Sequence, residues 1–174
     1  MTNLKRPVVF AYPVKDLTLA RYLAAKETDL IGLDLDDPDE QKTMRLLAQM
    51  REWIEGPKLI GVSARPGPEL LNRFPVDGYF MDADLPLPEG SIHLVSLSYA
   101  RANDECQAHY VIVDDGKGLD PSHLHLLRTD IRAKPLSGDG ITGFLIDPGR
   151  EEKTGLFDFD KLDDWFEQLE SLAD

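Results

Sequence analysis

Residues 143–151 read Gly-Phe-Leu-Ile-Asp-Pro-Gly-Arg-Glu, and residues 154–158 read Thr-Gly-Leu-Phe-Asp before an amphipathic helical pattern begins. The apolar run from Gly143 to Ile146 predicts a buried strand. The pattern that follows places apolar residues on one helical face, namely Leu162, Trp165, Phe166, Leu169 and Leu172. We therefore expect the chain to end with a strand and a helix that packs on it.

The same alternation of short apolar runs and helical patterns occupies the preceding sequence. The predicted strands are Val8–Tyr12, Leu30–Leu35, Leu59–Ala64, Gly78–Met81, His93–Leu97, Tyr110–Val113, Pro135–Ser137 and Gly143–Ile146. About eight strand–helix units imply a parallel sheet with right-handed crossovers, and closure into a (β/α)8 barrel of the TIM type is the expected result. An open doubly wound sheet is the alternative.

The predicted barrel is a minimal one. Its 174 residues form a single predicted domain, 1–174, whereas about 250 are typical of the fold. Several helices must therefore be shortened or replaced by loops. Residues 84–90 carry two prolines where a fourth helix would lie, and residues 138–142 are too few for a helical crossover. The second helix is the clearest, with Asp37 as its predicted cap and Pro38 at its first position.

Composition limits the function classes. The chain has 42% apolar residues and a net charge of -13, from 19 Lys and Arg against 32 Asp and Glu. A field of that sign repels nucleic acids and anionic membrane surfaces, so neither is an expected partner. Cys106 is the only cysteine, which excludes an internal disulfide. With no signal sequence and no membrane-spanning run, we expect a cytoplasmic protein.

Several segments, taken in order, are similar to phosphoribosylanthranilate isomerases. Besides the C-terminal stretch they are Ile31-Gly32, Ile60-Gly61-Val62, Val76-Asp77 and Val111-Ile-Val-Asp114. The resemblance implies a (β/α)8 fold and a role like that of the family in tryptophan biosynthesis. It also implies conversion of an aminoaldose phosphate to an aminoketose phosphate, with a cysteine after strand one as base and an aspartate after strand six as acid.

On this chain the family's acid falls on Asp114, but the family's base falls on Ala11, which cannot accept a proton. The family's Ser-Pro-Arg after strand two corresponds to the acidic stretch 36–39. We therefore expect ordinary isomerisation to be impaired. Any remaining activity would be that of an intramolecular oxidoreductase of the isomerase type.

The resemblance also identifies candidate ligand-binding residues. They are Gly116 and Gly118 after strand six, Gly138 and Gly140 after strand seven, Gly149 and Arg150 after strand eight, and Tyr12 beside the vacated base position. Glycine-rich turns offer backbone amides to anions. The alternative is that these glycines only turn the chain.

Carboxylates gather at the predicted strand ends. Asp34, Asp36, Asp82 and Asp147 are candidate metal ligands, because strand ends converge in a barrel and Mg²⁺ or Ca²⁺ binds clustered oxygen atoms. The alternative is that these acids cap helices or are solvated. No other cofactor is expected. His123 and His125 are predicted to face solvent from a helix, while His93 and His109 lie near strand starts.

Three functions follow in order of preference. The first is a divergent isomerase-like barrel with a small-ligand site at the strand C-terminal mouth, the ligand being a small molecule such as a sugar phosphate. The second is a non-catalytic binding or scaffold protein, and the third is a metal-dependent hydrolase or lyase. A homodimer is compatible with all three. An enzyme should bury Asp114 in an open mouth, whereas a scaffold should fill the mouth with Tyr12 or Phe144.

Overall fold

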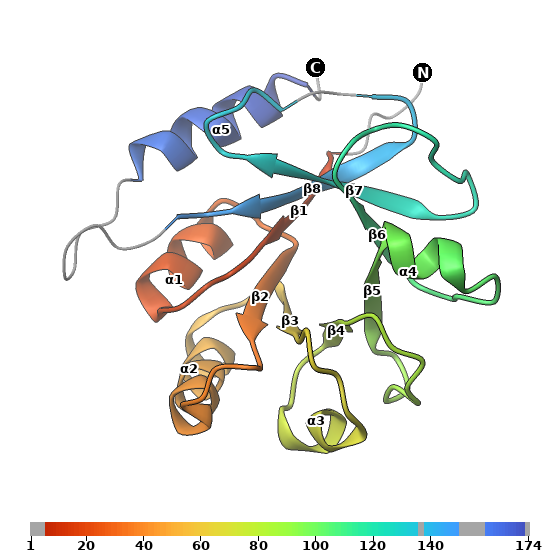
Figure 1. Cartoon of the computed structure of the whole chain (residues 1–174). Coiled ribbons are helices and arrows are strands. Elements are labelled where there is room, and N and C mark those ends of the chain that lie inside the picture. The colour runs from red at the N-terminus through yellow and green to blue at the C-terminus, as the bar shows by residue number, and fades with distance from the viewer. Residues whose placement is uncertain (1–5, 136–137, 150–158, 173–174) are drawn as a thin grey trace.

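A computed structural model describes residues 6–135, 138–149 and 159–172, and within them eight parallel strands close into a barrel (Figure 1). The strands are β1 Val8–Ala11, β2 Leu30–Asp34, β3 Lys58–Val62, β4 Gly78–Phe80, β5 Ile92–Ser96, β6 Tyr110–Val113, β7 Leu124–Asp130 and β8 Ile141–Asp147. Each strand pairs with the next, and β8 pairs with β1. The predicted TIM-type barrel is confirmed, and the open doubly wound sheet is wrong.

The seventh strand was predicted in the wrong place. It is Leu124–Asp130, not Pro135–Ser137, of which positions 136 and 137 lie outside the described residues. β7 runs between β6 and β8, with Leu126 opposite Ile112 and Leu127 opposite Phe144. His125 is therefore a strand residue, and it is 1% exposed. The prediction that it faces solvent from a helix is wrong.

Alternation along the strands separates the core into two layers. The barrel interior is filled by one cluster, which contains Phe10, Leu30, Ile60, Val62, Leu94, Ile112, Leu126 and Leu145. The neighbours of these residues point outward and pack against the helices, as Val9, Ala11 and Ile146 do. Because bulky side chains fill the interior, the barrel has no pore, and any ligand site must lie at its ends.

Five helices surround the barrel in the described part of the chain. They are α1 Leu17–Ala25, α2 Glu40–Trp53, α3 Pro68–Arg73, α4 Leu97–Ala102 and α5 Asp160–Glu170. The cap of α2 is Asp39, whose carboxylate accepts a hydrogen bond from the Lys42 amide at 3.0 Å. The prediction of Asp37 was wrong by two residues. The Asp37 carboxylate instead accepts a hydrogen bond from the Asp39 amide.

α5 packs against β8 on the outside of the barrel through its apolar face, as predicted. Trp165 is fully buried and meets Phe144 of β8 edge to face, with ring centres 5.9 Å apart. Tyr22 of α1 donates a hydrogen bond to Asp163 at 2.7 Å, which joins α1 to α5. Among the described residues, none of the helices has both the length and the apolar character needed to cross a bilayer.

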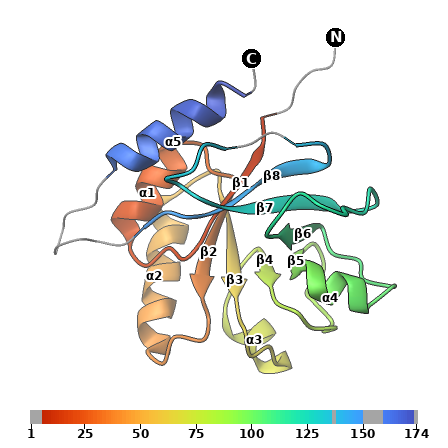
Figure 2. The ribbon, with the colours of Figure 1, turned by 45° about the horizontal axis from the view of Figure 1, so that its top comes forward.

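The helical coat is uneven (Figures 1 and 2). No helix occurs in residues 81–91 or 114–123, all of which the structure describes, nor in the described part of 131–140. This confirms the predicted loop after β4. The outer face of β6 is covered mainly by α4 and by loop side chains such as Leu119. Short crossovers therefore leave the side of β6 and β7 with a thinner cover than the side of β1 and β2.

Candidate functional site

Polar side chains occupy the inward positions at the C-terminal end of the barrel. Side chains alternate between the two faces of a strand, so each residue two positions beyond an interior residue points into this mouth. The residues placed in this way are Tyr12, Asp34, Asp82, Ser96, Asp114, Arg128 and Asp147. The side chains at these strand ends therefore form a ring around the mouth, and most of them are acidic.

Two hollows of similar size open in the mouth between described residues. The first, which we call the Asp34 hollow, has a volume of about 510 Å³ and is lined by residues that include Tyr12, Asp34, Asp36, Asp82 and Arg128. The second, the Asp147 hollow, measures about 500 Å³ and is lined by Tyr12, Pro13, Arg128, Thr129, Asp130, Leu145 and Asp147. Tyr12 and Arg128 line both hollows and form the partition between them.

Tyr12 is held in the mouth by its neighbours on both sides. Its amide donates a hydrogen bond to the Ile146 carbonyl of β8 at 2.9 Å. On β2, Gly32 leaves the space that the rings of Tyr12 and Phe10 fill, since a Cβ there would lie 2.9 Å from Tyr12 and 2.8 Å from Phe10. Burial raises the Tyr12 pKa, and so does the negative charge of Asp34, whereas Arg128 opposes the shift. The phenol therefore stays protonated at neutral pH and can donate a hydrogen bond.

Arg128 is a cation that lines both hollows, and sequence reasoning missed it. The guanidinium extends from β7, and its Nε donates a hydrogen bond to Asp114 Oδ1 at 3.0 Å. Both side chains are largely exposed, so this ion pair contributes little to stability. The predicted seventh strand, Pro135–Ser137, placed residue 128 in the crossover before it. Nothing in the sequence therefore indicated that this arginine lies at the mouth.

The carboxylates of Asp36 and Asp82 tie neighbouring strand ends together. Asp36 accepts hydrogen bonds from the Ser63 hydroxyl at 2.8 Å and the Ala64 amide at 2.7 Å. Asp82 accepts from the amide of Ser96 at 2.7 Å and from its hydroxyl at 2.6 Å. Each carboxylate therefore has a local role in shaping the rim, and the two serines had not been singled out in the sequence.

The other predicted metal ligands make turn contacts with the backbone. Asp34 Oδ1 accepts from the Asp36 amide, and Asp147 Oδ1 accepts from the Gly149 amide, both at 2.9 Å. Asp34, Asp36 and Asp82 share the Asp34 hollow, but Asp147 lies in the other one. No group of three or more His, Cys, Asp or Glu side chains within the described residues is arranged to hold a metal ion.

The predicted glycine sites divide between the two ends of the barrel. Gly138 and Gly140 come directly before β8, at the N-terminal end and away from the mouth, because β7 ends at Asp130. Their assignment to the mouth was wrong. Gly116 and Gly118 follow β6 and are exposed, and Gly149 follows β8. Arg150 lies outside the described residues.

The two residues that correspond to the family's acid and base do not form a pair in the mouth. Asp114 follows β6 as predicted, but its side chain is 88% exposed. Ala11 points away from the mouth and is fully buried in the layer beneath the helices. Phe144 also faces that layer, so it does not fill the mouth. The observed mouth thus matches neither of the two patterns expected from the sequence, since it is open but its acid is exposed.

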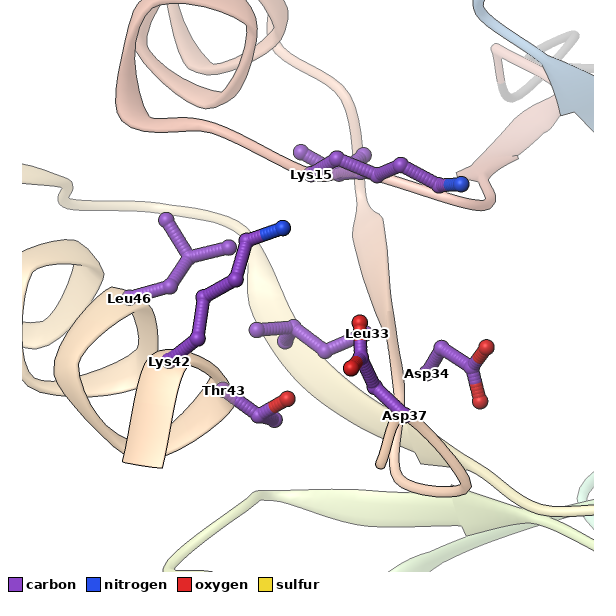
Figure 3. Close-up of a pocket in the computed structure, with 8 residues that line it drawn as sticks. Lys15, Leu33, Asp34, Asp37, Lys42, Thr43 and Leu46 are labelled. Carbon is purple, nitrogen blue, oxygen red and sulfur yellow. The ribbon is translucent and has the colours of Figure 1, made fainter. Parts of the chain in front are cut away.

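A smaller gap lies beside the mouth, between the start of α2 and the segment after β1 (Figure 3). Its volume is about 30 Å³, which is room for one or two water molecules. Its lining includes Lys15 from the segment after β1, Lys42 from α2, Asp34 at the end of β2 and Asp37 from the loop that follows. Two cations and two carboxylates leave no net charge, and the gap is too small for a substrate.

A third hollow lies on the outer surface, where a fourth helix would otherwise cover the sheet. It measures about 730 Å³, and its lining includes His93, Tyr99, Cys106 and His109. The backbone amide of His93 donates a hydrogen bond to Nδ1 of His109 at 3.1 Å, and Nε2 of His93 lies 3.3 Å from the Met81 carbonyl. Burial lowers the pKa of His93. None of the predicted site residues that the structure describes lines this hollow.

Taken together, the mouth offers hydrogen-bond donors and carboxylates around two open hollows that a small molecule could enter. Comparison of the chain with protein-family models and with curated proteins finds no match to either.

Proposed function

We propose that this protein binds a small polar ligand in the Asp34 hollow at the mouth of the barrel. On this proposal it is a divergent barrel of the phosphoribosylanthranilate isomerase type in which ordinary aldose–ketose isomerisation is impaired. The observation that carries the proposal is the hollow itself, because its volume is about 510 Å³ and polar side chains from several strands converge on it.

The inward side chains at the strand ends argue against the ordinary isomerase mechanism. The family's base follows strand one, and the inward residue just after β1 is Tyr12, whose pKa is raised above its ordinary value by burial. The corresponding acid, Asp114, is solvent-exposed and paired with Arg128. These features favour the second expected function, a binding protein without isomerase chemistry, over an active isomerase.

A thermal-shift titration with a non-reacting analogue of the isomerase product tests the proposal. A ligand at about 100 times its dissociation constant adds about 2.7 kcal/mol to the free energy of unfolding, which raises the midpoint by several degrees in a chain of this size. Inorganic phosphate and Mg²⁺ are run alongside. Stabilisation by the analogue that the Arg128→Gln variant lacks would support a site in the mouth.

The control variant is Arg45→Gln, which removes the same charge from the exposed face of α2. It should keep the shift. If phosphate alone stabilises the protein as much as the analogue does, the protein recognises only the anionic group of the analogue. If Mg²⁺ is the only stabilising probe, the third expected function, metal-dependent chemistry, replaces the present proposal.

A further inference from the structure

The Asp34 hollow has walls of opposite charge. Asp34 ends β2 and Arg128 lies on β7, and these strands are separated around the barrel by β8 and β1. Both side chains nevertheless line the same hollow, and Tyr12 stands between them. The arrangement is therefore not a plain cluster of acids, because a cation and a carboxylate face one shared space.

Three polar groups in this hollow have no hydrogen-bond partner among the described residues. They are the Tyr12 hydroxyl, Oδ2 of Asp34 and the two terminal nitrogens of Arg128, since Asp34 uses only Oδ1 and Arg128 only Nε. By contrast, both oxygens of Asp36 and of Asp82 accept hydrogen bonds from the protein. These groups are a carboxylate oxygen that can accept a hydrogen bond, a neutral hydroxyl that can donate one, and a positively charged pair of guanidinium nitrogens.

From this arrangement we infer that the ligand class of the proposed site is a small zwitterion, with an ammonium group toward Asp34 and a carboxylate toward Arg128. The inference rests on the proposed function and adds the chemistry of its ligand. The terminal nitrogens of arginine suit a carboxylate, and an ammonium group suits a carboxylate wall.

The charge of the whole molecule points the same way. A net charge of -13, with carboxylates around the rim, disfavours a ligand that carries only negative charge. Arg128 repels a ligand that is only cationic. A zwitterion has no net charge to be repelled, and each of its ends meets an opposite charge in the hollow.

A series of ω-amino acids measures the spacing between the two walls. The probes are glycine, β-alanine, γ-aminobutyrate, δ-aminovalerate and ε-aminocaproate, each titrated into the full chain by calorimetry. Butylamine and butyrate serve as the single-charge counterparts. We expect one chain length to bind best, and each single-charge counterpart to bind at least about tenfold more weakly, as loss of a charged hydrogen bond implies.

Substitutions assign the two ends of the ligand. Asp34→Asn and Arg128→Gln should each weaken the best probe by about tenfold or more. Asp139→Asn removes a carboxylate from the exposed turn before β8, at the other end of the barrel, and should have no effect on binding.

The outcomes separate the inference from the function on which it rests. If no ω-amino acid binds while the isomerase-product analogue still does, the mouth is a ligand site but the zwitterion is wrong. If neither binds, both proposals fail. Equal binding of γ-aminobutyrate and butylamine would show that Arg128 takes no part, which would also overturn the inference.

Discussion

The direction of two adjacent side chains determines what the mouth can do. Ala11 and Tyr12 follow one another at the end of β1, so they point to opposite faces. Ala11 packs beneath the helices, and Tyr12 lines both hollows. A sequence alignment that places a catalytic residue at position 11 therefore places it on the wrong side of the sheet, whatever that residue is.

The Tyr12→Phe variant should bind ligand more weakly without loss of stability. The hydroxyl has no hydrogen-bond partner among the described residues, so its removal breaks no contact within the fold. It does remove a donor from both hollows, and we expect affinity for the best ligand to fall by about 0.5–1.5 kcal/mol. Calorimetry measures the affinity and urea unfolding measures the stability. An equal loss of binding free energy and of unfolding free energy would contradict the prediction.

The Ala11→Cys variant should not gain isomerase activity. A thiol at this fully buried position would lie under the helices and outside the mouth, and the added sulfur should destabilise the fold by about 1–3 kcal/mol. Tyr12→Cys is the matched variant, because it places a thiol in the mouth. Isomerase turnover in Ala11→Cys, measured by product fluorescence or absorbance, would show that the inward and outward positions of β1 are exchanged.

β7 illustrates which elements can be predicted from sequence and which cannot. The other strands were found because they read as short, nearly continuous apolar runs, as expected of strands that are buried on both faces. β7 reads Leu-His-Leu-Leu-Arg-Thr-Asp, and its outward positions include His125 and Thr129 because loops rather than a helix cover it. A strand with a mixed outer face and a charged end resembles a surface segment. Arg128 was missed for that reason, whereas Asp34 and Tyr12 lie on strands that were correctly predicted.

Gly143 is needed where β8 closes the barrel against β1. A Cβ at this position would collide with the backbone of Val8, which cannot move without disturbing the strand pairing. Gly143→Ala should therefore destabilise the protein by about 1–3 kcal/mol, measured as a lower urea midpoint. Gly116→Ala is the matched control, because open space surrounds that position. Similar midpoints for the two variants would mean that β8 can shift to accommodate the methyl group.

Acidification should weaken the whole fold through two histidines. Burial is the main cause that lowers the pKa of His93 and of His125 in the folded state. Their unfolded pKa is about 6.5, so below that pH the unfolded chain binds more protons and stability falls, whereas above it the two groups have no effect. Urea midpoints at about pH 7.5 and about pH 5.5 test the sign. A His93→Asn variant should show a smaller change, and an unchanged midpoint in the parent protein would contradict the prediction.

The uneven helical coat has a consequence for how the barrel opens. Local unfolding begins where few apolar contacts protect the backbone, so amide hydrogens of β6 and β7 should exchange with solvent faster than those of β1 and β2. Exchange measured by mass spectrometry would show this gradient around the barrel. Arg128 belongs to the less protected side and Asp34 to the more protected one. A ligand that binds both side chains would link β7 to β2 and so make local unfolding of β7 less favourable. Slower amide exchange in β7 would then report occupancy of the site.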